Sequence, residues 1–283
     1  MTTWRDLYGE ATTRLGSKIE ARRIIERARG VEGADFFEGL GDPVTTRALA
    51  FFDTMLERRV AGEPLQYVLG AWGFRSLDLY VDRRVLIPRP ETEQVVEVAL
   101  AELRLLAVDK PTVVDLGTGS GAIALSIAKE VLTAQVWATD ASADALAVAR
   151  ANLAGIGRAA ARVRLEHGSW FSALPGLLQG RIDLVVSNPP YVADGEDLPP
   201  EVVDWEPADA LFSGPTGLES VTAILEAAPR WLARPGVCVL EIAPHQADEA
   251  VAAAYECGFL EAKAHPDLAG RPRALAARVG TAS

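Results

Sequence analysis

Cysteine is nearly absent from this sequence, with Cys238 and Cys257 the only two among 283 residues. Two cysteines cannot build a disulfide framework or a zinc cluster, so we expect no structural staple and no metal site. Cys238 lies in the apolar run Val237–Ile242 and is interpreted as a core residue. Apolar runs of membrane-spanning length are also missing, and Met1–Glu10 lacks the apolar stretch of a signal peptide. The sequence therefore predicts a cytoplasmic protein with no membrane partner.

Positive charge is in short supply as well. The 28 Lys and Arg residues against 39 Asp and Glu residues leave a formal net charge of −11. A surface this acidic repels phosphate backbones, and no basic run interrupts it, so direct binding of nucleic acid is not expected. What the chain does have is 49% hydrophobic and 24% charged residues, which is the balance of a globular protein with a sizeable core.

Residues 1–62 are expected to form a small helical domain. Ser17 followed by Glu20 is typical of a capping box, here opening a helix that runs to about Arg29. Asp42-Pro43 predicts the N-cap and first residue of a second helix that ends near Gly62. The buried face of that helix is predicted from three- and four-residue spacing to be Leu49, Phe52, Leu56 and Val60.

Residues 63–88 are expected to be a hairpin-like connector. Leu77, Leu79 and Val81 alternate with polar residues, as the residues of a half-buried strand do. An amphipathic helix from about Glu91 to Leu106 then opens a third segment, residues 89–283. The connector therefore separates a helical domain from a larger one.

Strands and helices alternate through the third segment, which predicts a mostly parallel sheet with helices on both faces. In that architecture ligands bind beyond the carboxyl ends of the strands. Chemical motifs are therefore expected directly after strands. The strand candidates are Thr112–Leu116, Ala134–Thr139, Val163–His167, Ile182–Ser187, Val237–Ile242, Phe259–Ala264 and Ala274–Val279. The clearest helical stretches between them are Ala122–Glu130, Ala143–Ala154 and His245–Glu256.

A glycine-rich loop, Gly117-Thr118-Gly119-Ser120-Gly121, follows the first of these strands and precedes a helix. Glycines let the backbone approach a ligand closely, and a helix N-terminus offers free N–H donors. Asp140, about twenty residues further on, can accept hydrogen bonds from both hydroxyls of a ribose. Loop and acid together indicate an adenosine-containing cofactor. Because Ala122 also completes a dinucleotide pattern, the glycines alone leave a nicotinamide cofactor, or a tight turn without a ligand, open.

The tetrad Asn188-Pro189-Pro190-Tyr191 follows the strand Ile182–Ser187 and indicates the chemistry. Two prolines stiffen the backbone and remove two N–H donors, leaving the Asn188 side-chain oxygen and a backbone carbonyl, that of Pro189, as rigid acceptors. Two acceptors can hold both hydrogens of a planar NH2 group, and Tyr191 offers a flat face to cover it. Such a nitrogen needs charge stabilisation more than a base, in keeping with a motif without histidine. A hydride transfer from a nicotinamide cofactor would not need two acceptors for an NH2 group, so we expect S-adenosylmethionine as the cofactor.

From these residues outward, the chain resembles the protein-(glutamine-N5) methyltransferases that modify peptide-chain release factors, the PrmC/HemK family. The tetrad alone is shared with adenine-N6 and guanine-N2 methyltransferases, whereas Pro88–Glu93 is much narrower in distribution and selects this family. The resemblance covers nearly the whole chain. The matching stretches are Gly62–Tyr67, Val85–Glu93, Asp115–Gly121, Ser187–Tyr191, Glu206-Pro207 with Ala210-Leu211, and Leu240–Ile242.

The resemblance implies an α/β fold of the class I S-adenosylmethionine-dependent methyltransferases: Rossmann-like, with a mostly parallel seven-stranded sheet and a small N-terminal helical domain. It implies S-adenosyl-L-methionine as cofactor and, as methyl acceptor, the glutamine of the Gly-Gly-Gln loop in class-1 peptide-chain release factors. By the same resemblance, Gly117–Gly121 lie along the cofactor, Asp140 binds its ribose and Trp170 packs near its adenine. Asn188 would hold both the cofactor side and the target amide, with Pro189–Tyr191 lining the substrate slot. The helical domain would contact the release factor.

Two alternatives stay open at this point. The first is a nucleic-acid methyltransferase acting on adenine N6 or guanine N2, which would need a flipped base and a cationic track. The second is a non-catalytic, cofactor-binding adaptor, against which the intact tetrad argues. Ala243 and Arg271–Arg273 depart from the family pattern and leave local loop shape open, away from the expected chemistry.

Overall fold

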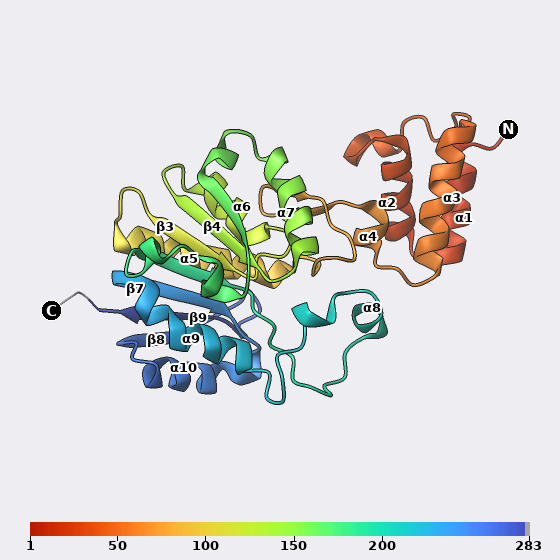
Figure 1. The fold of residues 1–283 in the computed structure, drawn as a ribbon. Coiled ribbons are helices and arrows are strands. Elements are labelled where there is room, and N and C mark those ends of the chain that lie inside the picture. Colours follow the sequence, from red (N-terminus) through yellow and green to blue (C-terminus); the bar gives the residue numbers. More distant parts are fainter. Residues whose placement is uncertain (281–283) are drawn as a thin grey trace. The chain divides into compact units, whose positions relative to one another are not determined.

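The protein is described by a computed structural model that covers residues 1–280 and divides into two compact units (Figure 1). The first unit consists of Met1–Trp72 together with Pro199–Trp205, and the second holds the rest of the described chain. Within residues 1–280, no helix combines the length and the apolar character needed to cross a lipid bilayer. Each unit has a hydrophobic core of its own.

The first unit is helical. Ser17 caps the second helix by accepting the Glu20 N–H, and Phe52, Met55 and Leu56 bury one face of the third. This unit's helices are α1 (Trp4–Leu15), α2 (Lys18–Arg29), α3 (Thr46–Val60), α4 (Leu65–Leu69) and α8 (Pro200–Val203).

The sequence-based boundaries of α3 need two corrections. The helix begins at Thr46, not after Asp42-Pro43, because the Thr45 side chain accepts the Ala48 N–H and serves as the N-cap. Pro43 instead lies in an isolated bridge with Thr3. Val60 is 47% exposed, so the predicted buried face ends one turn earlier.

A short hairpin of β1 (Trp72–Phe74) and β2 (Leu77–Leu79) follows, and all of its residues but Trp72 belong to the second unit. It confirms the strand predicted around Leu77 and Leu79. The main sheet of the second unit has seven strands in the order β5-β4-β3-β6-β7-β9-β8. The five strands β5, β4, β3, β6 and β7 are parallel to one another, and β9 runs antiparallel to both β7 and β8. This confirms the mostly parallel sheet. The strands are β3 (Thr112–Leu116), β4 (Gln135–Asp140), β5 (Val163–His167), β6 (Ile182–Ser187), β7 (Leu232–Glu241), β8 (Glu261–Pro266) and β9 (Pro272–Val279).

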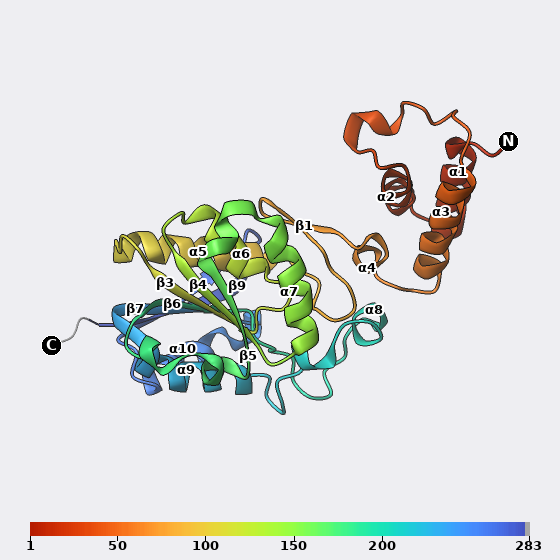
Figure 2. The same cartoon turned by 45° about the horizontal axis from the view of Figure 1, so that its top comes forward.

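Helices cover both faces of this sheet (Figure 2). One face carries α5 (Pro90–Leu106), α6 (Ala122–Glu130) and α7 (Ala143–Gly155). The other carries α9 (Glu219–Trp231) and α10 (Ala247–Glu256), which bury apolar side chains against the strands. Cys238 lies in the core beneath them, as expected.

The chain reverses direction within the sheet between β3 and β6. After β3 it builds outward through β4 to β5, and then returns to place β6 on the other side of β3. Such a switch point leaves a crevice at the carboxyl ends of the two strands. Leu116 of β3 pairs with Thr139 on one side and Ser187 on the other, and Ser187 pairs in turn with Leu240. The next residue along each of these four segments therefore lies at the same level, at or just beyond the end of its strand.

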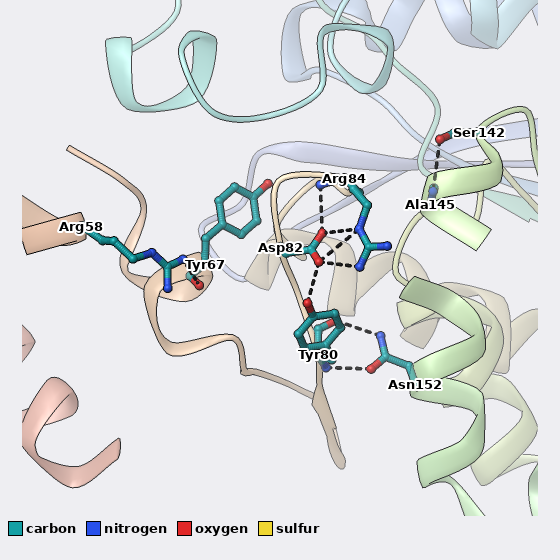
Figure 3. A network of polar contacts seen from close by, with 8 residues as sticks. All are labelled: Arg58, Tyr67, Tyr80, Asp82, Arg84, Ser142, Ala145 and Asn152. Carbon is teal, nitrogen blue, oxygen red and sulfur yellow. Dashed lines mark hydrogen bonds and ion pairs between the residues drawn. The ribbon is translucent and has the colours of Figure 1, made fainter. Parts of the chain in front are cut away.

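Asn152 of α7 binds the segment after β2 (Figure 3) and also contacts the glycine-rich loop. Its Oδ1 accepts the Tyr80 N–H at 2.7 Å, and its Nδ2 donates to the carbonyls of Tyr80 and Ser120 at 3.0 and 2.8 Å. In the same segment, the Tyr80 hydroxyl and the Arg84 guanidinium both donate to Asp82. The hydrogen bonds from Arg84 lower the pKa of Asp82 to about 2. No local pattern in the sequence indicated this role for Asn152.

We expect Asn152→Ala to lower the free energy of unfolding by about 2 kcal/mol, because three backbone groups lose their partner at once and Asn152 is only 7% exposed. Urea unfolding followed by circular dichroism would measure the loss. Gln179→Ala, which truncates an exposed amide, is the control and should stay within about 0.5 kcal/mol. Equal midpoints for Asn152→Ala and the wild-type protein would contradict this structural role.

Candidate active site

The glycine-rich loop leaves β3 at the switch point and needs its glycines for backbone shape. Gly117, Gly119 and Gly121 have φ angles of 68°, 55° and 87°, in the left-handed region that residues with a Cβ rarely adopt. Gly121 is the N-cap of α6, so the free N–H groups of that helix face the loop. A Cβ on Gly117 would come within 3.4 Å of the Trp170 ring. The loop thus presents bare backbone beneath an aromatic side chain.

Asp115, the fourth residue of β3, supports the loop from below. Its Oδ2 accepts the Thr118 hydroxyl at 2.6 Å and the Ala124 N–H at 3.1 Å. The side chain is fully buried, and this burial raises the pKa of Asp115 to about 7. Asp115 therefore fixes the loop to the start of α6.

Asp140 ends β4 beside the loop. Its Oδ2 accepts the Gly119 N–H and its Oδ1 accepts the Ser142 N–H, both at 2.8 Å. Burial raises the pKa of Asp140, while these two backbone N–H groups favour its charged form. Because each carboxylate oxygen has more than one lone pair, both oxygens can still accept a hydrogen bond from a ligand.

The Asn188–Tyr191 tetrad follows β6. The Asn188 Nδ2 donates to the Thr92 hydroxyl at 3.3 Å, and the Asn188 Oδ1 is buried with no hydrogen-bond partner among residues 1–280. The Tyr191 hydroxyl donates to Glu241 at 3.3 Å, and burial raises the pKa of Tyr191 far above its usual value. The Ser187 hydroxyl, just before the tetrad, donates to the Leu116 carbonyl at 2.6 Å and ties this strand end to β3.

A cavity of about 490 Å³ lies at this edge of the sheet, entirely within the second unit. It brings together most of the residues that the sequence singled out: Gly117, Thr118, Gly119, Ser120, Asp140, Trp170, Asn188 and Pro190. Gly121, Pro189 and Tyr191 do not line it. Within the described part of the chain, no group of three His, Cys, Asp or Glu side chains is placed to hold a metal ion.

Trp170 has a backbone conformation that is unusual for its residue type. Its φ is 44°, which is sterically costly for a residue with a Cβ and is typical of residues held in place at ligand sites. The side chain is half-buried, lies against Gly117 and lines the cavity. Its position therefore closes the side of the cavity above the loop.

Sequence reasoning missed three polar side chains that shape this site. Glu206 accepts the Ile87 N–H at 3.0 Å and also pairs with Arg89, which connects the Glu206-Pro207 stretch to Val85–Glu93. The Thr92 hydroxyl donates to Glu241 at 2.7 Å. Each of the two also binds one residue of the tetrad: Thr92 accepts from Asn188, and Glu241 accepts from Tyr191. All three lie in stretches that carry the family resemblance, so that resemblance was the available signal.

Comparison with known families and proteins bears on what this cavity binds. Residues 98–204 match the methyltransferase small domain family, and residues 9–70 match the PrmC N-terminal domain family. A release factor glutamine methyltransferase of Streptomyces coelicolor is 44% identical over 79% of this chain and 79% of its own length. One of Bifidobacterium longum is 42% identical over 95% of this chain and 97% of its own length.

Among solved structures, the T. thermophilus 16S rRNA N2 G1207 methyltransferase, in complex with AdoMet and guanosine, has a TM-score of 0.54 at 18% identity. The similarity covers 74% of this chain and 49% of that chain, and it shows the fold alone. The expected class I methyltransferase fold is confirmed, and S-adenosylmethionine replaces the nicotinamide alternative. This chain belongs to the release factor glutamine methyltransferase family, whose members are S-adenosylmethionine-dependent enzymes.

Proposed function

We propose that this protein transfers the methyl group of S-adenosylmethionine to the side-chain N5 of the glutamine in the Gly-Gly-Gln loop of class-1 release factors. The observation that carries the proposal is that Asn188 lines the cavity and that its Oδ1 is buried without a hydrogen-bond partner among residues 1–280. A buried acceptor left unpaired costs about 1–3 kcal/mol, so it is suited to a ligand that brings a donor. A glutamine amide brings two.

The residues around the cavity are suited to S-adenosylmethionine as well. We propose that Gly117–Gly121 lie along the cofactor, because backbone without side chains lets the cofactor approach closely. Asp140 would accept the two ribose hydroxyls, and Trp170 would pack near the adenine. Asn188 would lie between the cofactor and the target amide.

S-adenosylmethionine supplies an electrophilic methyl group bound to a sulfonium sulfur. The amide nitrogen spreads its lone pair into the adjacent carbonyl and is a poor nucleophile. In this proposal the Asn188 Oδ1 and the Pro189 carbonyl accept its two hydrogens, which favours a pyramidal nitrogen and stabilises the charge that develops on it. Holding the nitrogen in line with the bond to be broken contributes further. The methylated nitrogen is strongly acidic and loses its proton late, so no strong base is needed.

The remaining tetrad residues would shape the slot. Pro190 lines the cavity, whereas Pro189 and Tyr191 do not. In this proposal Pro189 contributes its backbone carbonyl and Tyr191 a ring that backs the amide plane. We assign residues 1–62 to release-factor binding, residues 63–88 to a connector and residues 89–283 to catalysis. Release factors act on cytoplasmic ribosomes, so we place the enzyme in the cytoplasm.

The substrate is tested by transfer of labelled methyl from S-adenosylmethionine to a purified class-1 release factor. We expect label on the wild-type factor and none on the factor whose Gly-Gly-Gln glutamine is changed to alanine. Label on both would mean that another residue is the acceptor. Label on RNA or DNA in place of the factor would favour the exocyclic-amine alternative.

The Asn188→Ala variant should slow methyl transfer by about 10²- to 10³-fold, the scale of losing one transition-state partner. Single-turnover rates with saturating cofactor and release factor would measure it, alongside unfolding midpoints that should remain near those of the wild-type protein. The surface variant Gln179→Ala should transfer at the wild-type rate. An unchanged rate for Asn188→Ala would show that the tetrad has only a structural role.

The Asp140→Ala variant should raise the dissociation constant for S-adenosylmethionine by about tenfold or more, because two charge-assisted hydrogen bonds to the ribose are lost. Isothermal titration calorimetry would measure this directly. Asp78→Ala, which removes an exposed carboxylate of β2, is the matched control and should change the constant less than about twofold. Equal affinity for the two variants would remove Asp140 from the cofactor site.

A further inference from the structure

Glu241 is a fully buried carboxyl group at the end of β7, directly beside the tetrad. It accepts two hydrogen bonds, from the Thr92 hydroxyl to Oε2 at 2.7 Å and from the Tyr191 hydroxyl to Oε1 at 3.3 Å. Burial raises the pKa of Glu241 to about 7, and the charge of the nearby Arg273 opposes that rise. Removing a carboxyl group from water is costly, and an apolar residue would stabilise the core better. A role for Glu241 beyond packing would account for its presence.

The three segments meet because of strand register. Ser187 pairs with Leu240, so the next residues along the chain, Asn188 just after β6 and Glu241 at the end of β7, lie side by side at this edge of the sheet. Thr92 comes from the first turn of α5, the helix that packs over these strands. It is 3% exposed and lines the cavity. All of these residues belong to the second unit.

Glu241, Thr92 and Asn188 form a series of hydrogen bonds in which each bond decides the direction of the next. An ionised Glu241 can only accept, so the Thr92 hydroxyl donates its single hydrogen to it. Toward Asn188 the Thr92 oxygen can therefore only accept, and Asn188 must present its NH2 group, at 3.3 Å. The two ends of a carboxamide have nearly the same shape, so only such partners fix which end faces which way. With Nδ2 held by Thr92, Oδ1 is the end left for a ligand.

We propose that Glu241 and Thr92 are positioning residues for methyl transfer: Glu241 orients the Thr92 hydroxyl, and Thr92 orients the Asn188 carboxamide with its oxygen toward the target NH2. The inference rests on the proposed role of Asn188. Through Tyr191, the same carboxyl also holds the far end of the tetrad. If Asn188 turned over, its NH2 would meet the NH2 of the substrate, donor against donor, and one of the two acceptors would be lost.

Thr92→Val tests the positioning role of the Thr92 hydroxyl, because valine has the shape of threonine without its hydroxyl. We expect kcat for release-factor methylation to fall by about 10- to 100-fold while the dissociation constant for S-adenosylmethionine changes less than about twofold. Thr92→Ser, which restores the hydroxyl, should recover kcat to within about threefold of the wild-type protein. Thr92→Ala removes the same hydroxyl without adding a methyl group and should reproduce the loss, so the test does not depend on the valine variant folding.

A buried hydroxyl elsewhere in the second unit provides the control. Ser126 of α6 is fully buried and its hydroxyl has no partner among the residues described, so Ser126→Ala should keep the wild-type kcat. Wild-type kcat in both Thr92→Val and Thr92→Ala would overturn the proposal. So would failure of Thr92→Ser to recover kcat, because the hydroxyl would then not be the group that matters.

A double-mutant cycle separates positioning from an independent effect. If Thr92 acts only through Asn188, then Thr92→Val should cost nothing further in an Asn188→Ala background. An equal loss of kcat in both backgrounds would contradict the inference. The roles of Asn188 and Thr92 are also tested separately. Wild-type kcat in Asn188→Ala would overturn the role of Asn188 itself, whereas slow Asn188→Ala with fast Thr92→Val would overturn the positioning alone.

Discussion

The site depends on one constraint, the register of four neighbouring parallel strands. Thr139, Leu116, Ser187 and Leu240 lie level across β4, β3, β6 and β7, and the Ser187 hydroxyl ties the middle pair together at 2.6 Å. The four residues that come next are Asp140, Gly117, Asn188 and Glu241. A carboxylate, a bare glycine, a carboxamide and a second carboxyl group are thereby placed along one edge of the sheet. A slip of one residue in any of these strands would turn its side chains to the opposite face and dismantle the site.

Polar groups at this edge lie over an apolar core, and removal from water changes their pKa values and the strength of their hydrogen bonds. Asp115 and Glu241 are fully buried, and desolvation raises the pKa of each to about 7. In such surroundings a hydrogen bond is stronger than in water, and an unpaired polar atom is more costly. Asp115 holds the glycine-rich loop through Thr118 and the start of α6, while Glu241 reaches the tetrad through Thr92 and Tyr191. The loop and the tetrad are each supported by one buried acid.

The Val85–Glu93 stretch, which selects the family from sequence, acts through position. The Ile87 N–H and Arg89 bind Glu206, and Thr92 binds Glu241, so the stretch ties both the Glu206-Pro207 segment and the end of β7 to the start of α5. Val85, Leu86, Pro88 and Thr92 of this stretch also line the cavity. A methyltransferase of the same fold without this stretch would keep the glycine-rich loop and lose these connections.

The sequence by itself determined the elements and motifs whose signals are local. The starts of α2 and α5, the strands β3, β5 and β6, the left-handed glycines and the tetrad were predictable because neighbouring residues decide caps, alternation and backbone freedom. The expected start of α3, with Asp42 as N-cap, was wrong because Thr45, three residues further on, is the residue whose side chain caps the helix. Only the tertiary structure decided the partners of Asn152 and the chain from Glu241 through Thr92 to Asn188. The hydrogen bonds that Thr92 makes to Glu241 and Asn188 join residues 149 and 96 positions apart. Contacts between such distant residues leave no periodicity or spacing in the sequence, because only the packing of α5 on the sheet brings them together.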